Sequence, residues 1–211
     1  MKLKVFIILF TFIICFYIQT FNNYKIRTFD NFLTDEECDY IIKKATEKGF
    51  QQSKVTAMRN GNKVDVPSQS RTSTNVFLKT DNDELLKKID YQTQLISKKP
   101  IENFEALQVV KYDGGQFYNE HFDATHHDTK GGLRYCTLLI YLNDDFEDGT
   151  TYFPMIDKHC VPKKGSAVLF YDVCAWPFYN CIHPMSKHAG ITPKNGVKYV
   201  CNKWVRCNKY L

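Results

Sequence analysis

The sequence lacks several features that would point to common functional classes. It has no basic run interleaved with aromatics, and its 28 Lys and Arg against 23 Asp and Glu give a modest net charge of +5. Nucleic acid is therefore not an expected partner. None of the 8 cysteines forms a C-x-x-C pair, which argues against a zinc site. The chain also lacks Asn-x-Ser/Thr sequons, internal repeats and low-complexity blocks, and 211 residues suffice for one substantial domain.

The N-terminus carries an almost uncharged apolar run over residues 5–21, preceded by Lys2 and Lys4. Its length is at the lower edge of what crosses a bilayer, and no small-x-small pair follows it. We therefore expect residues 1–23 to be an uncleaved signal anchor, a single-pass transmembrane segment, with a cleavable signal peptide as the alternative. This predicts location at the endoplasmic reticulum membrane or in the lumen-facing secretory pathway. Five cysteines cluster between Cys160 and Cys207, which is compatible with one or two disulfides in that oxidising compartment.

The segment after the anchor predicts two helices. Thr34-Asp35-Glu36-Glu37 has the form of a capping box and opens a helix that runs to about Lys48, with Gly49 as its stop. A polar stretch over 51–70 predicts a loop or edge hairpin. The second helix is expected over 81–97, and its buried stripe comprises Leu85, Ile89, Leu95 and Ile96.

The rest of the chain predicts short strands separated by Gly, Pro and Asp turns. Strand character is found over 71–78, 106–112, 116–123, 134–142, 149–153, 166–171 and 197–206. Many short strands punctuated in this way favour a sandwich or barrel over a parallel α/β sheet. The predicted fold class is therefore mainly β, with two N-terminal helices that support the sheet.

His121 and Asp123 are the first candidates for chemistry. Residues two apart in a strand point the same way, so both side chains can reach one ion. Two histidines and one carboxylate can hold one face of a metal and leave the opposite positions open, which is the geometry of non-haem Fe(II) oxygenases. The triplet is weak by itself, because it also occurs by chance. The remaining histidines are His126, His127 and His159 in polar loops, and His183 and His188 downstream.

The motifs around this triplet resemble those of the prolyl 4-hydroxylases. Their order and spacing agree with that family from about Arg71 to Arg206. Asp148 stands where the family has the first glycine of its G-G-x-T-x-F-P stretch. The matching motifs are Tyr112-x-x-Gly-Gln-x-Tyr118-x-x-His121-x-Asp123, then Arg134-x-x-Thr137 followed by Tyr141-Leu-Asn, then 147–154, and finally Lys198 through Trp204 to Arg206.

The resemblance implies an Fe(II)/2-oxoglutarate dioxygenase domain over residues 24–211, with a double-stranded β-helix, or jelly-roll, fold. Its cofactors would be Fe(II), 2-oxoglutarate as co-substrate, O2, and L-ascorbate as a supporting reductant. The metal ligands would be His121, Asp123 and His188. The family's spacing favours His188 over His183 as the third ligand, because it places that histidine ten residues before Lys198.

Further residues are predicted to bind the co-substrate and the peptide. An unpaired carboxylate inside an apolar barrel would be very costly, and Lys198 supplies the counter-charge. Thr137 and Tyr141 share a strand face and can offer hydroxyls to the same acid, while Tyr112 is expected near the iron-chelating end. Arg71, Ser73 and Arg134 are candidates for peptide contact, whereas Trp204 is expected to pack in the core.

The expected reaction is hydroxylation of peptidyl proline at C4 in proline-rich or collagen-like chains, coupled to decarboxylation of 2-oxoglutarate to succinate and CO2. Within the resemblance, a lysine at position 198 points to the collagen-type branch. Two alternatives remain open. One is a 2-oxoglutarate hydroxylase of another peptidyl residue, such as lysine. The other is a non-catalytic module that binds proline-rich peptides.

Overall fold

The computed structural model describes residues 24–59, 62–126, 130–174 and 181–211, together with Thr11. The predicted anchor therefore lies outside the described residues, except for Thr11, and so does His127. Within the described part of the chain, no helix has the length and apolar character that a bilayer crossing requires.

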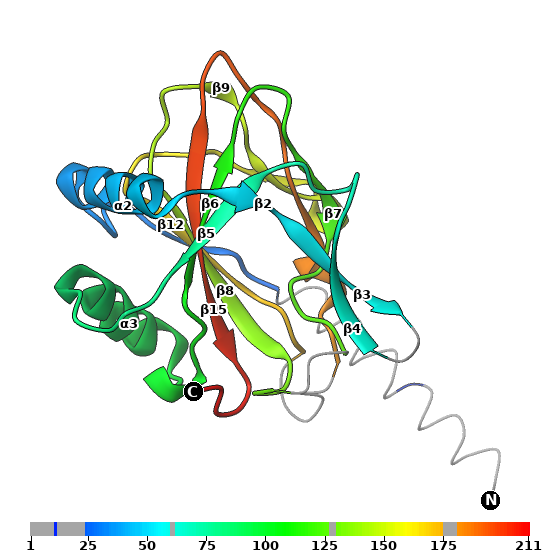
Figure 1. Ribbon diagram of the computed structural model, residues 1–211. Helices are drawn as coiled ribbons and strands as arrows, with labels where there is room; N and C mark the ends of the chain where they lie inside the picture. Colours follow the sequence, from blue (N-terminus) through cyan, green and yellow to red (C-terminus); the bar gives the residue numbers. More distant parts are fainter. Residues whose placement is uncertain (1–10, 12–23, 60–61, 127–129, 175–180) are drawn as a thin grey trace, which may run out of the picture.

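Seven strands form the larger of two main sheets, and every neighbouring pair in it is antiparallel. The predicted strands over 106–112, 134–142, 166–171 and 197–206 are confirmed, with one end of each moved by a single residue. In spatial order the strands are β1 (Arg27–Phe29), β12 (Ala167–Tyr171), β8 (Arg134–Tyr141), β15 (Lys198–Arg206), β6 (Leu107–Tyr112), β5 (Thr74–Leu78) and β2 (Gln51–Gln52) (Figure 1).

A smaller sheet of four antiparallel strands faces the first. Its order is β11 (Lys158–Cys160), β10 (Thr151–Phe153), β13 (His188–Gly190) and β7 (Tyr118–His121). Two short pairs complete the β structure, namely β14 (Pro193–Lys194) with β9 (Glu147–Asp148), and the hairpin of β3 (Lys54–Arg59) with β4 (Asn62–Pro67). Apolar side chains from both main sheets meet in one cluster between them. The predicted jelly roll is confirmed.

Strand β8 shows why the central strands read as continuous apolar runs. Leu138 and Ile140 pack in the cluster that includes the helices, while Leu139 and Tyr141 pack in the cluster between the sheets. Because successive side chains point to opposite faces and both faces are covered, every position in this part of the strand is buried.

Helices α2 (Asp35–Lys48) and α3 (Glu84–Ser97) cover the outer face of the larger sheet (Figure 1). The capping box of α2 and its end at Gly49 are as predicted. Helix α3 begins later than expected, because the Asp83 side chain accepts the Leu86 N–H and caps it there. Three one-turn 3-10 helices complete the structure, η1 (Ile101–Asn103), η2 (Pro154–Ile156) and η3 (Pro184–Ser186).

The buried face of α3 differs from the predicted stripe. Leu95 is 51% exposed, whereas Asp90 is only 5% exposed. Asp90 lies against the sheet because its carboxylate pairs with the Lys203 ammonium of β15 at 2.5 Å and accepts the Thr80 hydroxyl. A polar residue thus takes a buried position on the helix because its charge has a partner there.

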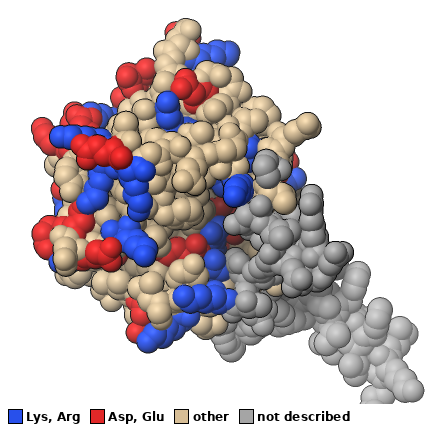
Figure 2. Space-filling view, viewed as in Figure 1, with Lys and Arg blue, Asp and Glu red and all other residues tan. Residues whose placement is uncertain are grey.

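The seven described cysteines are free thiols. Charges of both signs are intermingled over the helix side of the face in Figure 2, so the net charge of +5 does not gather there into a basic patch.

Candidate functional site

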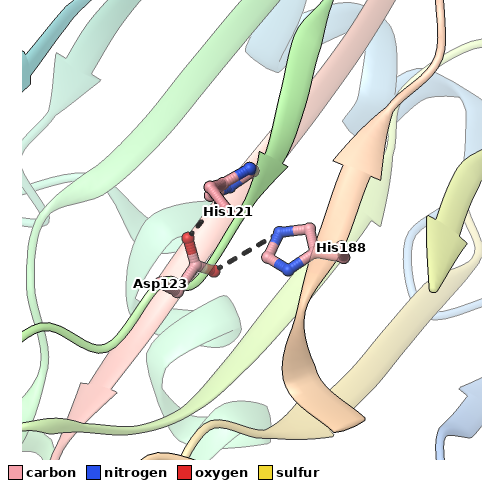
Figure 3. Close-up of side chains that lie close together, drawn as sticks. All are labelled: His121, Asp123 and His188. Carbon is pink, nitrogen blue, oxygen red and sulfur yellow. Dashed lines mark ion pairs between the residues drawn. The ribbon is translucent and has the colours of Figure 1, made fainter. Parts of the chain in front are cut away.

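The three predicted metal ligands lie close together beside the smaller sheet, with their side chains pointing toward one another (Figure 3). His121 ends β7, Asp123 lies in the bend that follows, and His188 begins β13. The strand predicted over 116–123 thus stops at His121. His188 stands directly opposite His121 in the antiparallel β7–β13 pair, which brings the two rings to 4.2 Å between centroids. One ligand atom from each residue lies within 4.8 Å of the others, so the three could hold one metal ion.

Backbone carbonyls orient both imidazoles. His121 Nδ1 lies 2.8 Å from the Asn119 carbonyl oxygen, and His188 Nδ1 lies 2.9 Å from that of Ser186. A carbonyl can only accept, so each Nδ1 carries the proton and each Nε2 offers its lone pair. Burial, and then His121, lower the pKa of His188 to about 4, which keeps this ring neutral near pH 7. Neutral imidazoles are the form that ligates a metal.

Asp123 is held as a carboxylate by donors on one of its two oxygens. Burial by itself would raise its pKa, but His188, His121 and Arg134 hold the pKa well below its usual range. Oδ2 accepts from the Thr137 hydroxyl at 2.6 Å and from the Trp204 indole N–H at 3.1 Å. Oδ1 lies 3.6 Å from His121 Nε2. The hydrogen bonds on Oδ2 thus leave Oδ1 for a metal.

The structure places Thr137 at the metal end of the barrel. Its hydroxyl contacts Asp123 and Asp172, with a distance of 2.9 Å to Asp172 Oδ2. The assignment of Thr137 to the 2-oxoglutarate site therefore stays a prediction, while its observed contacts are with these two carboxyl groups. The hydroxyl beside Tyr141 belongs instead to Thr151, at 2.9 Å between the two side-chain oxygens.

Lys198 lies inside the barrel with 1% of its surface exposed. Its ammonium donates to the Gly149 carbonyl at 2.6 Å and lies 5.2 Å and 5.9 Å from the ring centroids of Tyr112 and Tyr141. Among the described residues no carboxylate pairs with it, and burial lowers the pKa of Lys198 to about 7. An unpaired buried cation among aromatic walls fits an anionic ligand.

Tyr112 stands opposite Lys198 in the β6–β15 pair. Its hydroxyl lies close to Gly190, where an added Cβ would approach it to 2.9 Å. The glycine therefore makes room for the phenol between the two sheets. Sequence analysis had predicted Tyr112 as a residue of this site but had assigned Gly190 no role.

The predicted peptide contacts differ in their surroundings. The Arg71 guanidinium lies 4.6 Å from the ring centroid of Tyr118, which in turn stacks on His121 at 3.5 Å. Ser73 is fully buried, with its hydroxyl bonded to Arg71 and Ser53. This burial argues against a direct contact between Ser73 and a peptide.

Arg134 forms two hydrogen bonds to the Glu105 carboxylate, at 2.7 and 3.0 Å. Its guanidinium also lies 3.4 Å from the ring centroid of Trp204. Since Trp204 donates to Asp123, the pair supports the metal end of the site. Trp204 is buried, as predicted for a core residue, but its hydrogen bond to Asp123 was not predicted.

The other histidines that the structure describes, His126, His159 and His183, do not join the ligand trio. His183 caps η3, with Nδ1 accepting the Met185 N–H at 3.2 Å, and its ring lies 4.3 Å from that of Tyr24. His126 and His159 are exposed. The structure thus brings His188, and not His183, to the other two ligands.

Sequence analysis missed the roles of Thr151, Asp172 and Gly190 in the site and the hydrogen bond of Trp204. Thr151 was within a quoted motif, and period-two alternation places it on the buried face of β10 with Phe153. No local pattern marked Asp172.

The comparisons with known proteins agree with one another. Residues 107–206 match the family described as the 2OG-Fe(II) oxygenase superfamily. Prolyl 4-hydroxylase 1 of Arabidopsis thaliana is 34% identical over 200 residues, which cover 86% of this chain and 69% of that protein. An Acanthamoeba polyphaga mimivirus protein, provisionally described as a prolyl 4-hydroxylase, is 42% identical over 119 residues, or 53% of this chain and 48% of that protein.

A solved structure has a similar fold. The viral collagen prolyl hydroxylase of Paramecium bursaria Chlorella virus-1, in its 2OG complex, superposes with a TM-score of 0.71 at 28% identity. The match covers 88% of this chain and 97% of that one.

Proposed function

Because the chain belongs to the prolyl 4-hydroxylase family of the 2OG-Fe(II) oxygenase superfamily, we propose that it hydroxylates C4 of peptidyl proline in proline-rich or collagen-like chains. One observation carries the proposal. A trio of His121, Asp123 and His188 shares the interior of one barrel with the buried Lys198, which pairs with no carboxylate of the described residues. A metal at the first and a dicarboxylic 2-oxo acid reaching the second are the two requirements of this chemistry.

The residues fit Fe(II) and 2-oxoglutarate. Two neutral imidazoles and one carboxylate are the donor set that non-haem Fe(II) takes in such enzymes. When bound, the iron activates O2 with electrons from the decarboxylation of 2-oxoglutarate to succinate and CO2, and ascorbate serves as a supporting reductant. We propose His121, Asp123 and His188 as the ligands.

Lys198 binds the far carboxylate of the co-substrate. An ammonium that lacks an anionic partner gains a charge-assisted hydrogen bond when that carboxylate arrives. Tyr141 and Thr151 line the same end of the cavity with hydroxyls, and Tyr112 stands across from Lys198. Residues of the cluster between the sheets, Val110, Leu139, Phe153, Val168, Phe170 and Val200, exclude water around it.

The peptide approaches from the side of Tyr118 and Arg71. The Tyr118 ring stacks on His121 and the Arg71 guanidinium lies over the same ring, so both side chains stand next to the metal ligands. Aromatic side chains beside the site suit the recognition of proline in an extended chain. Arg134 is a second candidate for contact with the peptide.

A turnover assay with three peptides tests the proposal. The Fe(II)-loaded protein, with 2-oxoglutarate and ascorbate, is incubated with a proline-rich, a collagen-like and a lysine-containing peptide, and products are identified by mass spectrometry and amino-acid analysis. We expect 4-hydroxyproline with the wild-type protein and none with His121→Ala. Hydroxylysine alone would favour the other hydroxylase. Binding of proline-rich peptide with no turnover, while iron is bound, would favour a non-catalytic module.

We also propose that residues 1–23 anchor the domain in the endoplasmic reticulum membrane with the catalytic domain in the lumen. The apolar run over 5–21 and the two lysines before it support this. Tyr24, the first residue after the proposed anchor, packs its ring against His183 and donates to the Tyr171 carbonyl at 3.2 Å. We expect the protein to resist alkaline extraction from membranes. In sealed microsomes, we expect it to be protected from added protease. Release by alkali would contradict the anchor.

A further inference from the structure

The Thr137 hydroxyl lies between two carboxyl groups. Its oxygen is 2.6 Å from Asp123 Oδ2 and 2.9 Å from Asp172 Oδ2, and all three residues are buried. A threonine hydroxyl has one proton to donate and two lone pairs with which to accept. It can therefore donate to only one of the two carboxyl oxygens. The other contact is a hydrogen bond only if that carboxyl carries a proton of its own.

Asp123 is the carboxyl without a proton. Its Oδ2 also accepts the Trp204 indole N–H, and Arg134 lies near enough to donate to its backbone carbonyl at 3.3 Å. A second donor on the same oxygen favours the ionised form. Asp123 is also a proposed metal ligand, and a ligating carboxylate is deprotonated.

Asp172 is in the opposite situation. It follows β12 and is 0% exposed, and its Oδ1 has no hydrogen-bond partner among the residues that the structure describes. An anion left with an unpartnered oxygen in this position would be very costly, whereas a neutral acid leaves only a carbonyl unsatisfied. Burial first, and Asp123 second, raise the pKa of Asp172 well above its usual range, which agrees with the neutral form.

The backbone fixes where this carboxyl stands. The Asp172 N–H donates to the Tyr135 carbonyl at 2.9 Å, and its own carbonyl accepts from the His183 N–H at 2.9 Å. Both partners belong to segments that flank the site, so the side chain is held next to Thr137 on a rigid strand end.

We propose that Asp172 is a positioning residue: as a neutral acid it donates to Thr137, which then donates to Asp123 Oδ2 and leaves Oδ1 for the metal. The proposal rests on the proposed function, because it concerns the same metal site. A hydroxyl that receives a hydrogen bond from Asp172 has its own proton directed at Asp123. The chain of donors therefore fixes both the rotamer and the basicity of the ligand.

Infrared spectroscopy detects the proton on Asp172 directly. A protonated carboxyl has a C=O stretch that an ionised carboxylate lacks, and wild-type protein loaded with Zn(II) at pH 7 should show it. The band should vanish in Asp172→Asn and persist in Asp157→Asn, which alters an exposed aspartate. Absence of the band in the wild type, or its persistence in Asp172→Asn, would overturn the proposal.

Metal affinity detects the effect on Asp123. Thr137→Val removes the donor, and the dissociation constant for Co(II) should rise roughly 10- to 100-fold. Thr137→Ser keeps the hydroxyl and should stay within about threefold of wild type, a limit well below that expected loss. Asp172→Asn can still donate through its amide and should also stay near wild type, while Asp172→Leu should weaken Co(II) binding. Equal affinities in Thr137→Val and Thr137→Ser would overturn the proposal.

These measurements need no turnover. A wild type that hydroxylates proline but shows no protonated carboxyl would refute the role of Asp172 and leave the proposed function intact. A protonated Asp172 in a protein that binds metal but modifies no peptide would refute the function alone.

Discussion

Replacing Lys198 by methionine should separate co-substrate binding from stability. Methionine is similar to lysine in length and can fill the buried position of Lys198, but it lacks the ammonium that we propose binds the anion. Truncating one partner of a buried hydrogen-bonded charge pair costs about 2–5 kcal/mol, because the other charge is left unpaired. The dissociation constant for 2-oxoglutarate should therefore rise roughly 30- to 4,000-fold in Lys198→Met.

The same substitution should stabilise the protein without ligand. Burial lowers the pKa of Lys198 to about 7, below that of an unfolded lysine at 10.5. Between these values the unfolded state binds more protons than the folded one, so wild-type stability should rise as the pH rises through this window. Lys198→Met removes the buried charge. The free energy of unfolding of Lys198→Met should exceed that of wild type at pH 6. It should not increase with pH between about 7 and 10.5 as that of wild type does.

The assay is calorimetric titration of 2-oxoglutarate into Co(II)-loaded protein, together with urea unfolding of the metal-free protein. As a ligand control, 2-oxopentanoate has the same carbon chain with a methyl group in place of the far carboxylate. Its affinity should be similar in wild type and Lys198→Met.

Lys203 provides the matched protein control. It lies on the same strand, is also 1% exposed, and faces the helices, where its ammonium pairs with Asp90. Lys203→Met should lower the free energy of unfolding by about 3–5 kcal/mol, because Asp90 loses its partner, and leave 2-oxoglutarate affinity unchanged. If Lys198→Met binds 2-oxoglutarate within threefold of wild type, the assignment of Lys198 as the counter-charge is wrong.

Three further predictions concern the same elements. In wild type, the apparent dissociation constant for 2-oxoglutarate should increase about tenfold per pH unit above about 7, because Lys198 must take up a proton before it can bind the anion. Calorimetric titrations from pH 6 to 9 measure this, and a dissociation constant that does not change with pH would refute it. Asp90→Asn should lower the urea-unfolding free energy by about 3–5 kcal/mol, against less than about 0.5 kcal/mol for Glu84→Gln in an exposed pair. Gly190→Ala should destabilise by about 1–3 kcal/mol through its contact with the Tyr112 hydroxyl, and Tyr112→Phe in the same chain should recover part of the loss.

Local sequence signals were sufficient for the outer helices and for most strands of the larger sheet. The Thr34 and Glu37 capping box fixed the start of α2, because its donors and acceptors lie within one turn. The start of α3 was missed, because Asp81 and Asp83 are both plausible caps and only Asp83 reaches the Leu86 N–H. Strands β11 and β13 have three residues each, too few for a periodic pattern, and were not predicted as strands, whereas β1 lies in a segment predicted as extended over 24–32.

The candidate site was predicted in its ligands and only partly in its supporting residues. His121, Asp123, His188 and Lys198 are separated by spacings that the resemblance supplied. The position of the Thr137 hydroxyl between Asp123 and Asp172 was not predicted, because strand alternation gives the face of a side chain and not its position along the barrel axis. Thr151 from the opposite sheet takes the place beside Tyr141.

The amino-acid sequence alone supplies the reactive groups of this protein, namely two histidines, a carboxylate and a lysine in motifs that fit one family. It also supplies the apolar pattern of strands that are buried on both faces. Tertiary structure decided how those groups are used. The pairing of β7 with β13 sets His188 against His121, and a fully buried position beside Thr137 makes Asp172 a neutral acid. Such outcomes depend on which segments meet and how much water they exclude, and neither property is local in the chain.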